Sequence, residues 1–225
     1  MTDPDPDLQL AIWDVDGTLV DSREVIQSAM VRAFDACALT PPSYDQTRQI
    51  VGLDLFEACR RLAPPDYAEM PKLVAAYRQA FVSLRAEPDF EERFYKGALE
   101  TLTEMTQSGW LLAIATGKSR NGLRALFESH PLENYFDTIW CADDGPGKPD
   151  PFMCQQAMSA LGVVPENTFM IGDAIHDIRM GNSAGVRSLG VSWGFGAADE
   201  LRDAGAHSVY ESFDDLQRFL KLSKN

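Results

Sequence analysis

Two patterns of apolar and polar residues divide this chain of 225 residues. The first is a set of short, almost wholly apolar runs, which is typical of strands buried on both faces. Such runs occupy residues 10–13, 110–116, 138–141, 168–171, 186–193 and 208–210. Between the later runs apolar residues recur at helical spacing, which predicts helices at 98–108, 121–130, 151–161, 178–184, 199–204 and 213–222. Strands alternating with helices predict an α/β fold, a parallel sheet covered on both faces.

The second pattern lies between the first strand and the rest, where the spacing of apolar residues is helical only. The predicted helices are 24–39, 44–62 with an interruption at Gly52, and 68–85, separated by proline-containing breaks. We therefore expect two domains: a discontinuous α/β domain of residues 1–21 and 93–225, and an all-helical insertion of residues 22–92. The crossings near 20–23 and 91–96 are expected to act as hinges.

Composition limits the partners. Lys plus Arg number 20 against 34 Asp plus Glu, a net charge of −14, which argues against nucleic acid and anionic membrane surfaces. A phosphorylated substrate remains compatible, because a bound metal and one lysine can invert the potential locally. The four cysteines are widely spaced, and residues 1–7 are acidic rather than typical of a signal peptide. We expect a cytoplasmic protein, and the sequence predicts no oligomeric state.

Polar residues follow four of the predicted strands directly, and ligands of open α/β sheets bind at these carboxyl ends. Asp14 and Asp16 are next-but-one neighbours, so at a strand end they leave on the same side and need a cation between them or a proton. The full set is Asp14, Asp16, Gly17 and Thr18 after the first strand, Thr116 and Gly117 after the second, Lys148 after the third, and Asp173 and Asp177 after the fourth. Together they could form a magnesium site and a phosphate cradle.

Each piece also has an ordinary structural explanation. Asp-Gly and Thr-Gly pairs are common in turns, Asp173 could cap a helix, and a single lysine is usually solvated. Gly117-Lys118-Ser119 imitates the end of a phosphate-binding P-loop, but Leu112 stands where that motif needs glycine, so we reject it. His176 is expected at the surface or in a loop. Four strand ends that carry such residues in order favour a functional site.

These motifs resemble those of the haloacid dehalogenase-like hydrolase superfamily. The resemblance rests on Asp14-Val15-Asp16-Gly17-Thr18, Thr116, Lys148-Pro149-Asp150-Pro151 and Gly172-Asp173 with Asp177. The chain looks most similar to the phosphoglycolate-phosphatase-like branch, whose helical cap is inserted after the first motif. The resemblance implies a Rossmann-like sheet with this cap, Mg²⁺ as cofactor, and a small phosphorylated metabolite as substrate.

The resemblance also implies roles for residues. Asp14 would be the nucleophile that forms a phosphoaspartate, and Asp16 the general acid and base. Mg²⁺ would be held by the Asp14 carboxylate, the Asp16 main-chain carbonyl and Asp173, with Asp177 ordering these ligands. Thr116 and Lys148 would hold the phosphoryl oxygens. Substrate contacts are assigned to Gly17, Thr18 and Gly117 in the core, and by position to Gly52 and Leu53 in the cap.

Several related activities compete with a phosphoglycolate-type phosphatase. Dehalogenases of the superfamily lack the second aspartate, which is present here as Asp16. Sugar-phosphate mutases carry an early cap histidine, where Ile26 and Gln27 stand, and an arginine where Leu53-Asp54-Leu55 follows Gly52. Phosphonate cleavage needs a buried lysine, whereas Lys72 is expected at the surface. Pyrophosphate and nucleotide or sugar monophosphates stay open as substrates, and intact motifs argue against an inactive binding protein.

Overall fold

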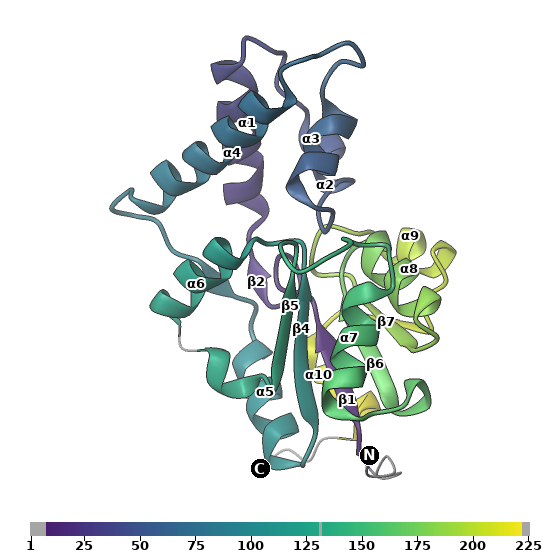
Figure 1. Cartoon of the computed structure of the whole chain (residues 1–225). Helices are drawn as coiled ribbons and strands as arrows, with labels where there is room; N and C mark the ends of the chain where they lie inside the picture. Colours follow the sequence, from purple (N-terminus) through teal and green to yellow (C-terminus); the bar gives the residue numbers. More distant parts are fainter. Residues whose placement is uncertain (1–7, 131, 222–225) are drawn as a thin grey trace.

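The computed structural model describes residues 8–130 and 132–221, so the expectations for residues 1–7 and for the helix end at 222 lie outside it (Figure 1). Its main sheet has six strands, all parallel, in the order β5-β4-β1-β6-β7-β8. These strands are β1 (Leu10–Trp13), β4 (Leu111–Thr116), β5 (Thr138–Cys141), β6 (Thr168–Gly172), β7 (Arg187–Val191) and β8 (Ser208–Tyr210). The predicted parallel sheet is confirmed.

Strand β1 lies inside the sheet, between β4 and β6, and its four side chains are fully buried. Ala11 and Trp13 face one hydrophobic core, and Leu10 and Ile12 face the other, as the two-residue period of a strand requires. A strand that is covered on both faces must be apolar at every position, which explains the uninterrupted run. The helices on either face supply the rest of each core.

The helices of the α/β part lie close to the predicted ranges. They are α5 (Ala98–Gln107), α6 (Arg120–Ser129), α7 (Phe152–Leu161), α8 (Ile175–Ser183), α9 (Ala198–Asp203) and α10 (Phe213–Phe219), with 3-10 turns at Leu132–Tyr135 and Pro165–Asn167. Helix α8 begins three residues before the predicted Ile178, because the Asp177 carboxylate accepts a hydrogen bond from the Ala174 backbone N–H, 2.9 Å away. This places Asp177 in the first turn of the helix.

The segment between β1 and α5 forms four helices above the carboxyl edge of the sheet (Figure 1). They are α1 (Arg23–Ala36), α2 (Tyr44–Arg48), α3 (Leu55–Leu62) and α4 (Met70–Arg85), and they share hydrophobic cores of their own. The predicted interruption at Gly52 is confirmed: Gly52 has a φ of +91°, and Asp54 caps the new helix α3. The predicted domain limits at 21/22 and 92/93 stay a prediction.

The two crossings between the helical segment and the sheet pair with each other. Strands β2 (Val20–Asp21) and β3 (Arg93–Phe94) form a two-stranded antiparallel ribbon that the sequence did not predict. A strand of two residues is too short to show alternation, so its pairing depends on tertiary contacts alone. The ribbon lies within the residues that we expected to act as hinges, a role that stays a prediction.

The cysteines and the apolar character of the helices complete the description of the fold. All four cysteines are unpaired within the described residues, and Cys59, Cys141 and Cys154 are buried. None of the helices in the described part of the chain combines the length and the apolar character of a membrane span.

Truncating a core residue of α5 tests the packing of this helix on the sheet. Leu102 is fully buried, and Leu102→Ala should reduce the free energy of unfolding by about 2–5 kcal/mol through lost burial and a cavity. Leu99, in the same helix, is 37% exposed, and Leu99→Ala should cost at most about 1 kcal/mol. Urea denaturation measures both variants. Equal losses would contradict this packing.

Candidate active site

The carboxyl ends of the central strands bring the predicted site residues together. Asp14 follows β1, Thr116 ends β4 and Asp173 follows β6, and β1 is the neighbour of both other strands. A cleft of about 810 Å³ opens between this edge and the helical segment. Its core side is lined by Asp14, Asp16, Thr116, Gly117 and Lys118. The predicted catalytic edge of the sheet therefore borders a cavity that can hold a small molecule.

A buried lysine forms ion pairs with two of the aspartates. The Lys148 Nζ lies 2.5 Å from Asp14 Oδ1 and 2.6 Å from Asp177 Oδ1. All three side chains are at most 3% exposed, so solvent screens these charges little. Burial opposes the charge of Lys148, but Asp14 and Asp177 raise its pKa above the usual value, which keeps the ammonium charged. Removal of either partner would leave uncompensated charge in the interior.

Asp14 experiences opposing influences from its surroundings. Burial raises the pKa of its carboxyl, Lys148 lowers it, and the negative charges of Asp177 and Asp16 raise it again, to about 7. In the protein alone this carboxyl therefore holds its proton more tightly than an exposed aspartate does. A cation placed beside it favours the ionised form, in which Asp14 is a nucleophile.

Asp173 is fixed by three hydrogen bonds on the other side of the cluster. Its carboxylate accepts hydrogen bonds from the Thr18 hydroxyl at 2.8 Å and from the Phe195 backbone N–H at 2.7 Å, and its main-chain carbonyl accepts one from Gly196 at 3.1 Å. Burial and the charges of neighbouring aspartates raise the pKa of Asp173 well above its usual value, which these hydrogen bonds only partly offset. The carboxylates of the cluster therefore outnumber the one ammonium, Lys148, that the described residues place against them.

The donor set fits a divalent cation. One carboxylate oxygen each from Asp14, Asp173 and Asp177 lies within 4.8 Å of the others, and all three residues are buried. Three carboxylates face one lysine, and oxygen ligands of this kind suit Mg²⁺. A Cβ atom at Gly17 or Gly194 would collide with the Asp173 carboxylate, so glycine at both positions leaves the space open. The main-chain carbonyl of Asp16 stays a predicted ligand.

Asp16 lies in a different environment from Asp14. Its Oδ1 is 3.0 Å from the Nζ of Lys118, the second residue after β4. Its side chain is 15% exposed and lines the cleft. In the sequence, Lys118 follows Gly117 within a stretch that only imitates a P-loop, and no role is predicted for it. Its place beside Gly117, at a strand end that already carried two candidates, was the available signal.

The cap loop predicted from position alone reaches the site. A Cβ atom at Gly117 would lie 2.7 Å from the Leu53 carbonyl oxygen and 2.8 Å from that of Gly52, so these backbones are in close contact. Leu53 lines the cleft, and a Cβ atom at Gly52 would be 3.9 Å from Lys148 Cδ. Thr18, in contrast, is fully buried, and its hydroxyl binds Asp173. Its predicted substrate contact and those of Gly17, Gly52, Leu53 and Gly117 stay predictions.

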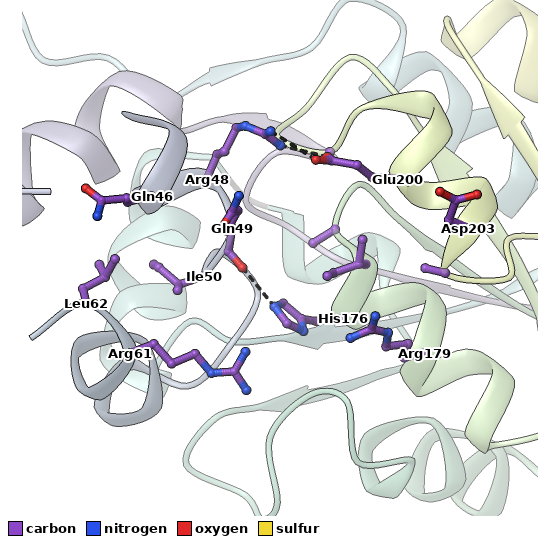
Figure 2. Close-up of a pocket in the computed structure, with 14 residues that line it drawn as sticks. Gln46, Arg48, Gln49, Ile50, Arg61, Leu62, His176, Arg179, Glu200 and Asp203 are labelled. Carbon is purple, nitrogen blue, oxygen red and sulfur yellow. Dashed lines mark hydrogen bonds and ion pairs between the residues drawn. The ribbon is translucent and has the colours of Figure 1, made fainter. Parts of the chain in front are cut away.

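A second cavity, of about 590 Å³, lies between helices α2 and α3 and helices α8 and α9 (Figure 2). His176 is buried here, which corrects the expectation of a surface or loop residue: its Nε2 donates a hydrogen bond to the Gln49 carbonyl oxygen, 3.1 Å away. Burial lowers the pKa of this ring, which favours its neutral form. The Arg48 guanidinium binds Glu200 at 2.8 and 3.1 Å. These contacts connect the helical segment to the α/β part.

Comparisons with known proteins agree with this geometry. A family model described as haloacid dehalogenase-like hydrolase matches residues 11–191. The chain is 34% identical to the probable phosphatase IndB of Dickeya dadantii over 96% of both chains. It is 33% identical to a phosphoglycolate phosphatase of Agrobacterium fabrum, covering 83% of this chain and 81% of the relative. It is 31% identical to the pyrophosphatase PpaX of Halalkalibacterium halodurans, covering 93% of this chain and 95% of the relative.

The solved structures give the same result for the fold. A predicted phosphatase from Clostridium acetobutylicum superimposes with a TM-score of 0.82, covering 96% of this chain and 100% of that one at 26% identity. The match extends through both the sheet and the helical segment, since it covers nearly the whole chain. The chain thus shares its α/β architecture, with helices inserted after β1, with the Clostridium acetobutylicum protein.

The charge of the aspartate cluster predicts a pH-dependent stabilisation by Mg²⁺. Metal must displace protons from Asp14, whose pKa is raised to about 7, and from Asp173, whose pKa is also raised, so its apparent affinity should fall by about tenfold or more per pH unit as the pH drops below about 7. Thermal unfolding with and without Mg²⁺ at pH values of about 6, 7 and 8 measures this, and the shift should grow with pH.

Asp173→Asn is the control for this experiment. It should remove the Mg²⁺-dependent shift at every pH, because one charged member of the cluster is lost. A shift of equal size in the variant, or one that does not depend on pH in the wild type, would contradict a metal site at this cluster.

Proposed function

The chain belongs to the haloacid dehalogenase-like hydrolases, and on this basis we propose that it is a Mg²⁺-dependent phosphatase that hydrolyses a small phosphate monoester through a phosphoaspartate. The observation that carries the proposal is the environment of Asp14. This carboxylate borders the cleft, pairs with Lys148 at 2.5 Å, and lies in a cluster with Asp173 and Asp177. A nucleophile at phosphorus needs this combination of an open face and nearby positive charge.

Asp14 and Asp16 perform different parts of the reaction. An Asp14 oxygen attacks phosphorus, the bond from phosphorus to the ester oxygen breaks, and Asp16 protonates the departing oxygen. Asp16 then takes a proton from water as that water attacks the same phosphorus, which releases phosphate and restores Asp14. The two environments support this division, since Asp14 is buried against Lys148 and Asp16 faces the cleft beside Lys118.

The remaining site residues hold the phosphoryl group. The Lys148 ammonium donates a hydrogen bond to Asp14 and forms an ion pair with Asp177, and as a group with three protons it can donate another to a phosphoryl oxygen. The Thr116 hydroxyl accepts a hydrogen bond from the Lys118 backbone N–H at 3.2 Å and lines the cleft, where it can donate its own proton to a phosphoryl oxygen. The Asp14 carboxylate, the Asp16 main-chain carbonyl and Asp173 would hold Mg²⁺, and Asp177 would order these ligands. When bound, the metal would screen the negative charge of phosphate from the attacking carboxylate.

Two small substrates are favoured by the relatives. Phosphoglycolate is the first candidate, because a relative of 33% identity is named a phosphoglycolate phosphatase. Pyrophosphate is the second, because a relative of 31% identity is named a pyrophosphatase. The arrangement at the sheet edge suits either, since both present a terminal phosphoryl group. A phosphonate-cleaving reaction has no support, because the Lys72 side chain is 59% exposed.

Turnover of a panel of phosphorylated metabolites with Mg²⁺ tests this function. The wild type should release phosphate from phosphoglycolate or pyrophosphate, and from 4-nitrophenyl phosphate. Asp14→Asn should reduce kcat at least about a thousandfold, because no acyl phosphate can form at residue 14. Asp199→Asn, at a side chain that is 93% exposed, is the matched control and should keep full activity.

Two results would count against the proposal. An Asp14→Asn variant with undiminished kcat would exclude this nucleophile. Conversion of a sugar phosphate into its isomer, with little release of phosphate, would instead identify a mutase.

A further inference from the structure

Lys118 is a buried cation whose position the proposed function does not use. Its side chain is 7% exposed, and its Nζ lies 3.0 Å from Asp16 Oδ1 and 3.8 Å from Glu92 Oε1. Within the described residues, Asp16 Oδ1 accepts no hydrogen bond of good geometry. The Lys118 ammonium is therefore the charged group that contacts this oxygen. Because an ammonium on a flexible stem would otherwise be solvated, its burial between two carboxylates indicates a specific structural role.

The same cation is in contact with the helical segment. The Lys118 Nζ lies 5.3 Å from the ring centroid of Phe81 in α4, and the Arg85 guanidinium lies 5.0 Å from the same centroid. Arg85 in turn binds both oxygens of Glu92 at 2.8 Å. The charges therefore alternate from Asp16 through Lys118 and Glu92 to Arg85, and the chain of contacts ends on α4, next to the second crossing.

We propose that Lys118 is a positioning residue, which holds the Asp16 carboxylate in the cleft and makes its position depend on the placement of α4. The inference rests on the proposed role of Asp16 as general acid. A carboxylate at the edge of a cleft can rotate, and an ion pair to a buried, immobile ammonium restricts that rotation. Movement of α4 would carry Phe81 away from the ammonium, and the restraint would weaken.

This role has a kinetic signature that a direct contact with phosphate would not have. The alkoxide of an alkyl phosphate leaves slowly without a proton from Asp16, whereas 4-nitrophenolate leaves without one. Loss of a residue that positions the acid therefore affects alkyl esters selectively. Loss of a residue that binds the phosphoryl group affects both esters alike. The ratio of kcat/KM values separates the two roles, because kcat/KM covers only steps up to release of the alcohol.

The test compares kcat/KM for 4-nitrophenyl phosphate and for the alkyl phosphate that the wild type hydrolyses fastest. Lys118→Met should reduce kcat/KM about tenfold or more for the alkyl ester and less than about threefold for the aryl ester. Lys118→Arg keeps the positive charge. Its ratio of kcat/KM values, alkyl over aryl ester, should lie between those of Lys118→Met and the wild type. Lys72→Met, at an exposed lysine of α4, should leave both values unchanged. Thermal unfolding confirms that the variants fold.

Asp16→Asn separates failure of the inference from failure of the proposed function. If Asp16→Asn shows no selective loss on the alkyl ester, the proposed acid is wrong and the inference falls with it. If Asp16→Asn shows that loss and Lys118→Met does not, or if Lys118→Met loses equally on both esters, only the inference is overturned. In the Asp16→Asn background, Lys118→Met should cause no further selective loss.

A second pair of variants tests the link to α4. Phe81→Leu removes the aromatic ring next to the Lys118 ammonium. It should selectively lower kcat/KM for the alkyl ester, by less than Lys118→Met does. Phe90→Leu makes the same substitution at a half-buried phenylalanine of residues 22–92 that does not line the cleft, and should not change the ratio. Identical ratios in Phe81→Leu and the wild type would overturn the dependence on α4.

Discussion

Uncompensated negative charge at the carboxyl edge of the sheet is the constraint on which the rest of the site depends. Asp14, Asp173 and Asp177 are buried together, and within residues 8–130 and 132–221 Lys148 supplies the one cation in contact with Asp14 and Asp177. Folding places these groups by strand order, because β1 and β6 are neighbours and the loop after β5 brings the lysine across. Such a cluster is costly in the protein alone and favourable once a divalent cation binds. In the proposed function, a bound Mg²⁺ would offset this charge and favour the ionised, nucleophilic form of Asp14.

The helical segment completes the cleft and connects to the site at separate points. The Gly52–Leu53 backbone lies against Gly117, Arg48 and Gln49 bind Glu200 and His176, and Phe81 lies over Lys118. These contacts reach the loop after β4, through Gly117 and Lys118, and helices α8 and α9 of the α/β part. Admission of a substrate requires some of these contacts to separate, whereas exclusion of water during the reaction requires them to form. The contact through Lys118 is the one that also reaches the proposed acid, Asp16.

The sequence predicts the main sheet and the central site well, because both depend on strong local signals. Apolar runs such as residues 168–171 have few alternatives to a buried strand, and parallel order brings Asp14, Thr116 and Asp173 to one edge. Contacts made across the fold are not predictable in this way. The β2–β3 ribbon is too short to show a pattern of alternation. His176 is buried where its ring binds the Gln49 carbonyl oxygen, 127 residues away in the sequence. The start of α8 depends on the hydrogen bond between Asp177 and the Ala174 N–H. Lys118 lacked a role because its partners, Asp16, Glu92 and Phe81, come from three distant segments.

The central claim is that phosphate is transferred to the carboxylate of Asp14, and chemical trapping tests it directly. The protein is mixed with Mg²⁺ and a substrate that it hydrolyses, quenched in acid and reduced with borohydride, which converts an aspartyl phosphate into homoserine. Peptide mass spectrometry then locates the modified residue. The account predicts homoserine at position 14, dependent on both substrate and Mg²⁺. Modification at a different aspartate, or none during steady turnover under conditions that trap an acyl phosphate in a known phosphoaspartate enzyme, would contradict it.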